Sequence, residues 1–277
     1  MKRLKVMPWV WGGIAMLVAL VIFIIPFAFI FVTASKTAGE ALFLQFSWPT
    51  EWAIWKNIAE VFATNDFMLV RSFGNSLILT IFSVAGVVVL CSATAYIIDR
   101  RPGRLAKFAN ALILAGLIIP PALVPTIFVM QGLGIYGSFP GMILIEIAFN
   151  ASFTVMIFKS FISTIPRELD EAAILDGAGP LRLYFQVVFP LLRSVTVTVI
   201  ILNSVFVFND FTNPLYFMNG PGAETIQLTL FNFTSQFQSN YNLLFMDILL
   251  ITVPMVVLFA IFNRRIVAGM TAGSVKG

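Results

Sequence analysis

Residues 166–190 read PRELDEAAILDGAGPLRLYFQVVFP, a polar segment between two apolar stretches of the chain. Pro166 suits the first position of a helix, where its missing N–H group is no loss. Acidic residues follow in the first turns, where the helix dipole favours carboxylates: Glu168, Asp170 and Glu171. Gly177 is typical of the position just past a helix C-terminus, and Pro180 can open a second short helix. The segment therefore predicts a helix, a turn and a second helix, too short to be stable in water without a partner surface.

The composition of the whole chain places this segment in a membrane protein. Of 277 residues, 59% are hydrophobic and 11% are charged, whereas soluble domains have about 45–50% apolar and about 25% charged residues. The apolar residues come in blocks long enough to cross the hydrocarbon layer, which is about 30 Å thick. We therefore predict an all-α polytopic membrane protein.

The apolar blocks divide the chain into six predicted transmembrane spans within a single domain, 1–277. The predicted spans are residues 9–32, 73–98, 108–130, 140–161, 191–211 and 243–262. The polar segments are a leader (1–8), the loops 33–72, 163–190 and 213–242, and a tail (263–277). The third span contains Pro120, Pro121 and Pro125, which predicts a broken or kinked helix that faces protein or a cavity.

The first span has an alternative interpretation as a cleavable signal peptide, with Val32-Thr33-Ala34 as the cleavage site. The apolar region of a signal peptide is only about 7–15 residues long, whereas the uncharged run here covers residues 9–32. We therefore favour an uncleaved membrane anchor.

The positive charges lie mainly on one side of this predicted topology. With the N-terminus inside, the outer segments contain only Lys36, Lys56 and Arg71 of the 17 Lys and Arg residues. Cytoplasmic segments of membrane proteins carry the excess of positive charge. This asymmetry predicts that both termini and the loop 163–190 are cytoplasmic. It also accounts for the net charge of +4 without any binding of nucleic acid.

The chain lacks the residues on which most catalytic and metal sites depend. It contains no His, the commonest metal ligand. Its one Cys, Cys91, is interpreted as a small apolar packing residue. No Gly-rich phosphate loop of the Walker type occurs, so the chain does not bind ATP by that route. We predict no catalytic site and no metal bound by this chain.

Several polar residues fall within or at the end of predicted spans, where an ionisable group is a candidate functional residue. The candidates for lining a substrate pathway are Glu146, Asn150, Asn203, Asn209 and Asp210. Glu146 and Asn150 are four residues apart and share one face of a helix. The alternative for all of these groups, and for Asp247 near the outer end of the sixth span, is hydrogen bonding between helices or placement at the membrane interface.

The polar loop resembles the EAA signature of binding-protein-dependent ABC importer permeases: Glu-Ala-Ala, three residues, Gly, nine residues, Ile-x-Leu-Pro. Here the signature reads Glu171-Ala172-Ala173, Gly177 and Val187-x-Phe189-Pro190, with Val and Phe replacing Ile and Leu. Asp176 and Ala178 match the form usual among sugar importers. The segments 73–77, 208–210 and 264–277 resemble the maltose-type, MalG-like permease of the carbohydrate-uptake family, so the resemblance covers nearly all of the chain after residue 70.

In that family the EAA loop forms a coupling helix that docks on a separate cytoplasmic ATPase. The resemblance implies a non-catalytic permease of the bacterial inner membrane, which forms half of a carbohydrate pathway and binds no cofactor, because ATP and Mg²⁺ are bound by the ATPase. The implied coupling residues are Glu171, Ala172, Ala173, Asp176, Gly177 and Pro190. The implied partners are a second homologous permease subunit, two ATPase subunits, a periplasmic or lipid-anchored solute-binding protein that contacts loop 213–242, the carbohydrate and membrane lipid.

Other functions remain open at this point. An importer permease for glycerol phosphate or a polyamine would share the EAA loop, although the EAAxxDGA form and the tail favour a sugar. A proton-coupled secondary transporter would use Glu146, Asp210 or Asp247 as proton relays, but it has no need of an EAA loop. A membrane enzyme would require a cluster of catalytic groups, and the sequence shows none.

Overall fold

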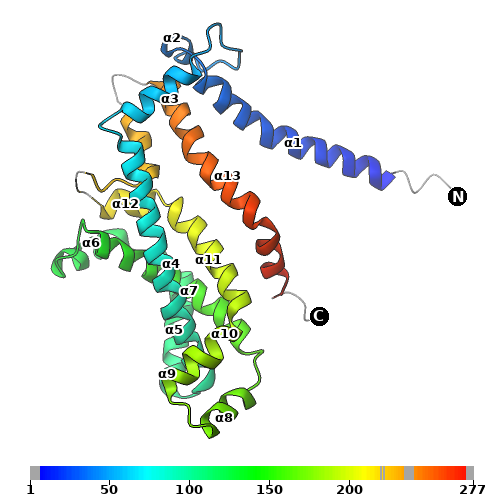
Figure 1. Ribbon diagram of the computed structural model, residues 1–277, viewed down its shortest axis with the longest axis vertical. Helices are drawn as coiled ribbons and strands as arrows, with labels where there is room; N and C mark the ends of the chain where they lie inside the picture. The colour runs from blue at the N-terminus through cyan, green and yellow to red at the C-terminus, as the bar shows by residue number, and fades with distance from the viewer. Residues whose placement is uncertain (1–6, 219, 221, 234–239, 273–277) are drawn as a thin grey trace, which may run out of the picture. The chain divides into compact units, whose positions relative to one another are not determined.

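A computed structural model of the chain describes residues 7–218, 220, 222–233 and 240–272, and their regular secondary structure is entirely helical (Figure 1). This confirms the predicted all-α fold class. The helices are α1 (Met7–Ala34), α2 (Ala38–Ala41), α3 (Ile54–Ala63), α4 (Met68–Arg100), α5 (Arg104–Ile118), α6 (Leu123–Gly132), α7 (Phe139–Ile162), α8 (Glu168–Leu175), α9 (Pro180–Arg182), η1 (Leu183–Val188), α10 (Phe189–Leu191), α11 (Arg193–Phe208), α12 (Thr212–Phe217), η2 (Ile226–Phe233) and α13 (Tyr241–Ala272).

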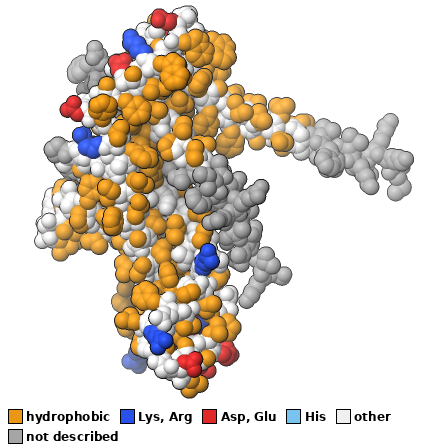
Figure 2. All heavy atoms as spheres, viewed as in Figure 1, with side chains coloured by type: hydrophobic (Ala, Val, Ile, Leu, Met, Phe, Trp, Pro, Cys, Tyr) orange, Lys and Arg blue, Asp and Glu red, His pale blue; other side chains and the backbone are white. Residues whose placement is uncertain are grey.

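Three of these helices, α1, α4 and α7, are long and apolar enough to cross a membrane. They match the first, second and fourth predicted spans. A fourth candidate is the pair formed by Pro180–Leu191 and α11, which is bent by 78°. The described residues thus establish three clear spans, while the count of six stays a prediction. Figure 2 shows hydrophobic side chains over most of the visible surface, as a lipid-facing protein requires.

The predicted third span, 108–130, is two separate helices. α5 ends at Ile118 and α6 begins at Leu123. Pro120 and Pro121 lie in the break, where each lacks an N–H donor and crowds the carbonyl four residues earlier. The predicted break is therefore present, and neither half has the length of a full span.

α13 continues to Ala272, beyond residue 262, where the predicted sixth span ends. Residues 263–272 contain no Pro, so the helix has no local reason to stop where the apolar block does. Residues 1–6 of the predicted leader, residues 273–277 of the tail, and residues 219, 221 and 234–239 of the loop 213–242 lie outside the described residues.

The chain divides into two compact units, and the first comprises Met1–Val70 with Thr229–Pro254. A buried polar network holds its helices together. The Asn57 side chain donates to the carbonyls of Ala34 and Lys36, both at 2.8 Å, and accepts a hydrogen bond from Asn242 at 2.9 Å. The buried Lys36 ammonium donates to the Gln45 carbonyl at 2.6 Å. These bonds satisfy carbonyls that the end of α1 leaves open and join α1, α3 and α13.

The second unit comprises Arg71–Leu228 with Met255–Gly277. Val87 of α4, Phe158 of α7 and Val199 of α11 are fully buried in one apolar core. A second apolar cluster, around Met142 and Phe217, packs the start of α7 against α12. This core positions the loop that follows α7, which lies beyond the C-terminal end of α4 (Figure 1).

Candidate coupling site

The EAA loop begins with α8, whose N-cap is Arg167 and whose first helical residue is Glu168. The prediction that Pro166 occupies the first helical position was therefore wrong. The carbonyl of Arg167 is the one that accepts the first hydrogen bonds, from the amides of Asp170 at 2.9 Å and Glu171 at 3.1 Å. Pro166 precedes the cap, where its missing N–H group is equally harmless.

α8 ends in a Schellman turn built on Gly177. The Gly177 amide donates to the Ile174 carbonyl at 3.0 Å, and the Ala178 amide donates to the Ala173 carbonyl at 2.9 Å. Both bonds require a left-handed residue just past the helix, and Gly177 has a φ of +81°. The predicted role of Gly177 in stopping the helix is confirmed.

The second half of the loop also starts as predicted, with Pro180 at the beginning of α9. It then widens into the π-helical turn η1 and the short helix α10, which contains Pro190. Pro190 cannot donate to the carbonyl of Gln186 and its ring crowds that carbonyl, which favours a wider turn. The chain bends by 78° before α11, so the helix of the predicted fifth span begins at Arg193 rather than residue 191.

The loop exposes apolar side chains next to the carboxylate of the EAA motif. Leu175 and Leu181 are 88% and 75% exposed, and Glu171, Ala172 and Asp176 are exposed as well. Ala173, in contrast, packs against the apolar core of the second unit. We call Glu171, Ala172, Leu175, Asp176 and Leu181 the coupling surface. Leu175 and Leu181 were missed by motif matching, although their position on a polar loop was a signal that they need a partner.

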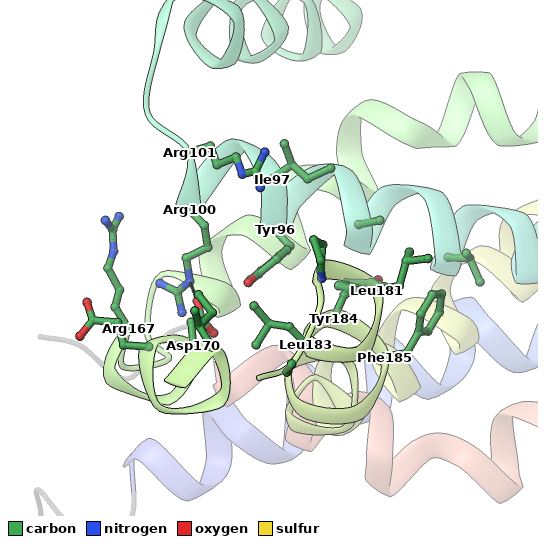
Figure 3. Close-up of a pocket in the computed structure, with 16 residues that line it drawn as sticks. Tyr96, Ile97, Arg100, Arg101, Arg167, Asp170, Leu181, Leu183, Tyr184 and Phe185 are labelled. Atoms are coloured by element: carbon green, nitrogen blue, oxygen red, sulfur yellow. Dashed lines mark ion pairs between the residues drawn. The ribbon is translucent and has the colours of Figure 1, made fainter. Parts of the chain in front are cut away.

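A cavity of about 810 Å³ lies between this loop and the C-terminal half of α4 (Figure 3). Its walls are mainly apolar and include Val89 and Ile97 of α4 and Phe185 of η1. Charged residues line the cavity near the end of α4: Arg100, Arg101, Arg167, Asp170 and Glu171. The Nε atom of Arg100 lies 2.7 Å from Oδ2 of Asp170. The sequence placed both residues in cytoplasmic segments but could not indicate that they pair.

Three of the predicted pathway residues lie together. The Asn150 amide donates to the backbone carbonyl of Glu146 at 2.9 Å and to its carboxylate at 3.2 Å. Asp210, just past α11, interacts with the side chain of Glu146 and accepts a hydrogen bond from the Asn213 amide at 3.1 Å. α7 and the start of α12 thus bring two carboxyl groups and two amides into one polar cluster, which we call the Glu146 cluster.

The remaining polar candidates lie elsewhere. Asn203 is buried and donates to Thr154 of α7 at 3.3 Å, which is the alternative role of joining helices. Asn209 is exposed and accepts from Gln227 at 3.3 Å. Asp247 is buried in the first unit, where Thr229 donates to it at 2.7 Å.

The long apolar helices α1, α4 and α7, together with a polar helix–turn–helix loop, define an integral membrane protein. The comparison with known families agrees. Residues 88–272 match the model of the binding-protein-dependent transport system inner membrane component, and the chain belongs to this family. It is therefore a non-catalytic permease subunit of a membrane transport system.

Named relatives and a solved structure support the same assignment. The chain is 33% identical, over 91% of each sequence, to the melibiose/raffinose/stachyose import permease protein MelC of Bacillus subtilis (strain 168). It is 31% identical to the diacetylchitobiose uptake system permease protein NgcG of Streptomyces coelicolor, over 92% of this chain and 85% of that protein. Its fold is similar to a chain of a bacterial ABC transporter involved in the import of alginate, with a TM-score of 0.79, 17% identity and coverage of 95% of this chain and 98% of the other.

Proposed function

We propose that this chain is the permease subunit of an ATP-driven importer that takes up a carbohydrate delivered by a solute-binding protein. The observation that carries the proposal is the coupling surface. Glu171 and Leu175 are one turn apart on α8, and the apolar side chains of Leu175 and Leu181 are exposed. Such a patch favours burial against a protein partner, and a carboxylate at its edge favours a strong, charge-assisted hydrogen bond to that partner.

The partner proposed for this surface is a cytoplasmic ATPase that binds ATP and Mg²⁺. Two ATPase subunits and a second homologous permease would complete the importer, with this chain supplying half of the pathway. The exposed apolar side chains of α1, such as Met16 and Phe23, supply area for lipid and for a second permease. In this arrangement both termini are cytoplasmic, and the loop 213–242 faces the solute-binding protein in the periplasm.

The proposed substrate class is a carbohydrate, in keeping with the names of both relatives. The Glu146 cluster combines amide and carboxyl groups, the group types that bind the hydroxyls of a sugar. Glu146 itself is buried, so a sugar would contact the cluster through Asn150 and Asp210, which are partly exposed.

The test is a pull-down of the chain from detergent-solubilised native membranes, with Glu171→Ala and a matched control. Glu168→Ala removes an exposed carboxylate from the same helix but outside the coupling surface. We expect the wild-type chain and Glu168→Ala to retain a Walker-motif ATPase and a second permease. The amount of ATPase that co-purifies with Glu171→Ala should be at least tenfold lower than with the wild-type chain, because a polar group of the ATPase would be left unpaired in the interface.

The contradicting result is recovery of the chain without an ATPase, together with sugar uptake that collapses under a protonophore. That outcome would favour a proton-coupled transporter and direct attention to Glu146 and Asp210. Equal loss of ATPase in the two variants would show that Glu171 has no specific contact.

A further inference from the structure

Arg100, the last residue of α4, contacts the EAA loop at two points. Its Nε atom lies 2.7 Å from Oδ2 of Asp170 on α8, and its Nη2 atom donates to the carbonyl of Ile165, before α8, at 2.9 Å. The side chains of Arg100 and Asp170 are only 9% and 11% exposed. Since water screens such a pair weakly, the attraction between the two charges is stronger than at an open surface.

Asp170 differs in this respect from the other acids of α8. It is the buried residue of the helix, whereas Glu168 and Glu171 face solvent. The hydroxyl of Tyr96, one turn before Arg100 on α4, points toward Asp170 (Figure 3). Asp170 is thus directed at α4, while Glu171 belongs to the coupling surface.

The loop makes further polar contacts with α4 at two separate positions along the helix. Arg167, the N-cap of α8, donates to the carbonyl of Asp99 at 3.2 Å. Farther up α4, the hydroxyls of Ser92 and of Tyr184 in η1 lie 2.6 Å apart. The cavity of about 810 Å³ leaves part of the space between α4 and the loop unfilled, while Ala173 of α8 packs against the apolar core that includes Val87 of α4. The polar contacts act beside this packing and join the first turn of α8 to the end of α4.

α4 can transmit a displacement from its C-terminal end to its N-terminal end. It is one continuous helix from Met68 to Arg100, and its sequence contains no Pro, the usual cause of a sharp bend. A shift applied at Arg100 would therefore move the whole helix rather than its last turn.

We propose that the Arg100–Asp170 ion pair is the joint through which movement of the EAA helix displaces α4, and that both are positioning residues for transport. The proposal rests on the proposed function, because it takes α8 to be the element that the ATPase moves. It assigns different tasks to adjacent residues of one helix: Glu171 faces the ATPase, and Asp170 connects the helix to the membrane span.

The experiment follows the outer end of α4 in the purified complex with its ATPase. Val70, which is 53% exposed, is replaced by Cys in a chain carrying Cys91→Ala, and the rate of labelling by a membrane-impermeant maleimide is measured. We expect trapping with ATP and vanadate to change this rate at least threefold in the otherwise unaltered chain. Asp170→Asn and Arg100→Gln should abolish that change while the ATPase still co-purifies.

Two further variants separate the ion pair from a general structural role. Arg101→Gln removes the neighbouring cation, which also lines the cavity, and should keep the full change in labelling. The exchange Arg100→Asp with Asp170→Arg restores the pair with its charges reversed and should recover at least half of the change. An exchange variant whose labelling responds to ATP and vanadate no better than that of the single variants would overturn the proposal.

Failure of the joint and failure of the proposed function give different results. If no ATPase co-purifies with the wild-type chain, the importer proposal fails and this inference fails with it. If the ATPase co-purifies but labelling at residue 70 is unchanged by ATP and vanadate, or changes equally in Asp170→Asn, only the joint is overturned.

Discussion

Gly177 occupies a backbone conformation that other residues adopt only with strain. Its φ of +81° closes the Schellman turn after α8, and a Cβ atom there would have no atom within 4 Å. The requirement for Gly is thus conformational and not one of space. In an L-residue the left-handed region costs about 1–2 kcal/mol, and a β-branched side chain is restricted further.

Gly177→Val should therefore distort the turn and lower both the yield of the assembled complex and its ATP hydrolysis by at least fivefold. The matched control is Gly179→Val, because Gly179 has a φ of −69° that ordinary residues accept and also has open space around it. The measurement is co-purified ATPase and its activity for both variants. Normal yield and stimulation in Gly177→Val would contradict the prediction.

Among the helices, the predicted boundaries agree best with the structure where a local signal, such as a capping residue, marks the helix end. α7 spans Phe139–Ile162, within one residue of the predicted 140–161, and Ser138 caps it by accepting a hydrogen bond from the Gly141 amide at 3.2 Å. α13 extends past the end of the predicted sixth span, because hydropathy marks where the apolar block ends and not where the helix ends.

The first turn of α7 depends on the absence of a side chain at Gly141. A Cβ atom at this position would lie 2.1 Å from the backbone oxygen of Ile135 and 3.0 Å from Cε of Met130. Gly141→Ala should destabilise the chain by about 1–3 kcal/mol, since the backbone must shift to relieve the overlap. Gly132→Ala, at the end of α6, meets no atom within 4 Å and should be neutral. Thermal unfolding in detergent tests this, and equal melting temperatures for the two variants would refute it.

For the whole molecule, the distribution of Lys and Arg predicts which side of the membrane each loop occupies. Single cysteines in a Cys91→Ala chain test this topology in right-side-out and inverted vesicles. Leu175→Cys, on the exposed coupling surface, should react with a membrane-impermeant maleimide only in inverted vesicles. Trp48→Cys, also exposed, should react only in right-side-out vesicles. The reverse labelling pattern would show that the topology is the opposite of the predicted one and that the coupling surface does not face the cytoplasm.

Features that depend on neighbouring residues could be predicted from the amino-acid sequence. Apolar blocks indicated membrane spans, Pro120 and Pro121 indicated the break between α5 and α6, and Gly177 indicated the end of α8. Each follows from the conformational limits of a few adjacent residues or from the free energy of placing them in lipid. The EAA spacing likewise identified the family, because that motif is local.

The contacts between distant polar groups, in contrast, depend on how the helices pack. Arg100 pairs with Asp170, Asp210 lies near Glu146 and Asn203 donates to Thr154, and each contact joins separate segments of the chain. Hydropathy determines that a helix lies in the membrane, but the packing of side chains against its neighbours sets its rotation and depth. In α8, the same kind of packing sets a rotation that turns Asp170 toward α4 and leaves Glu171, the next residue, facing solvent.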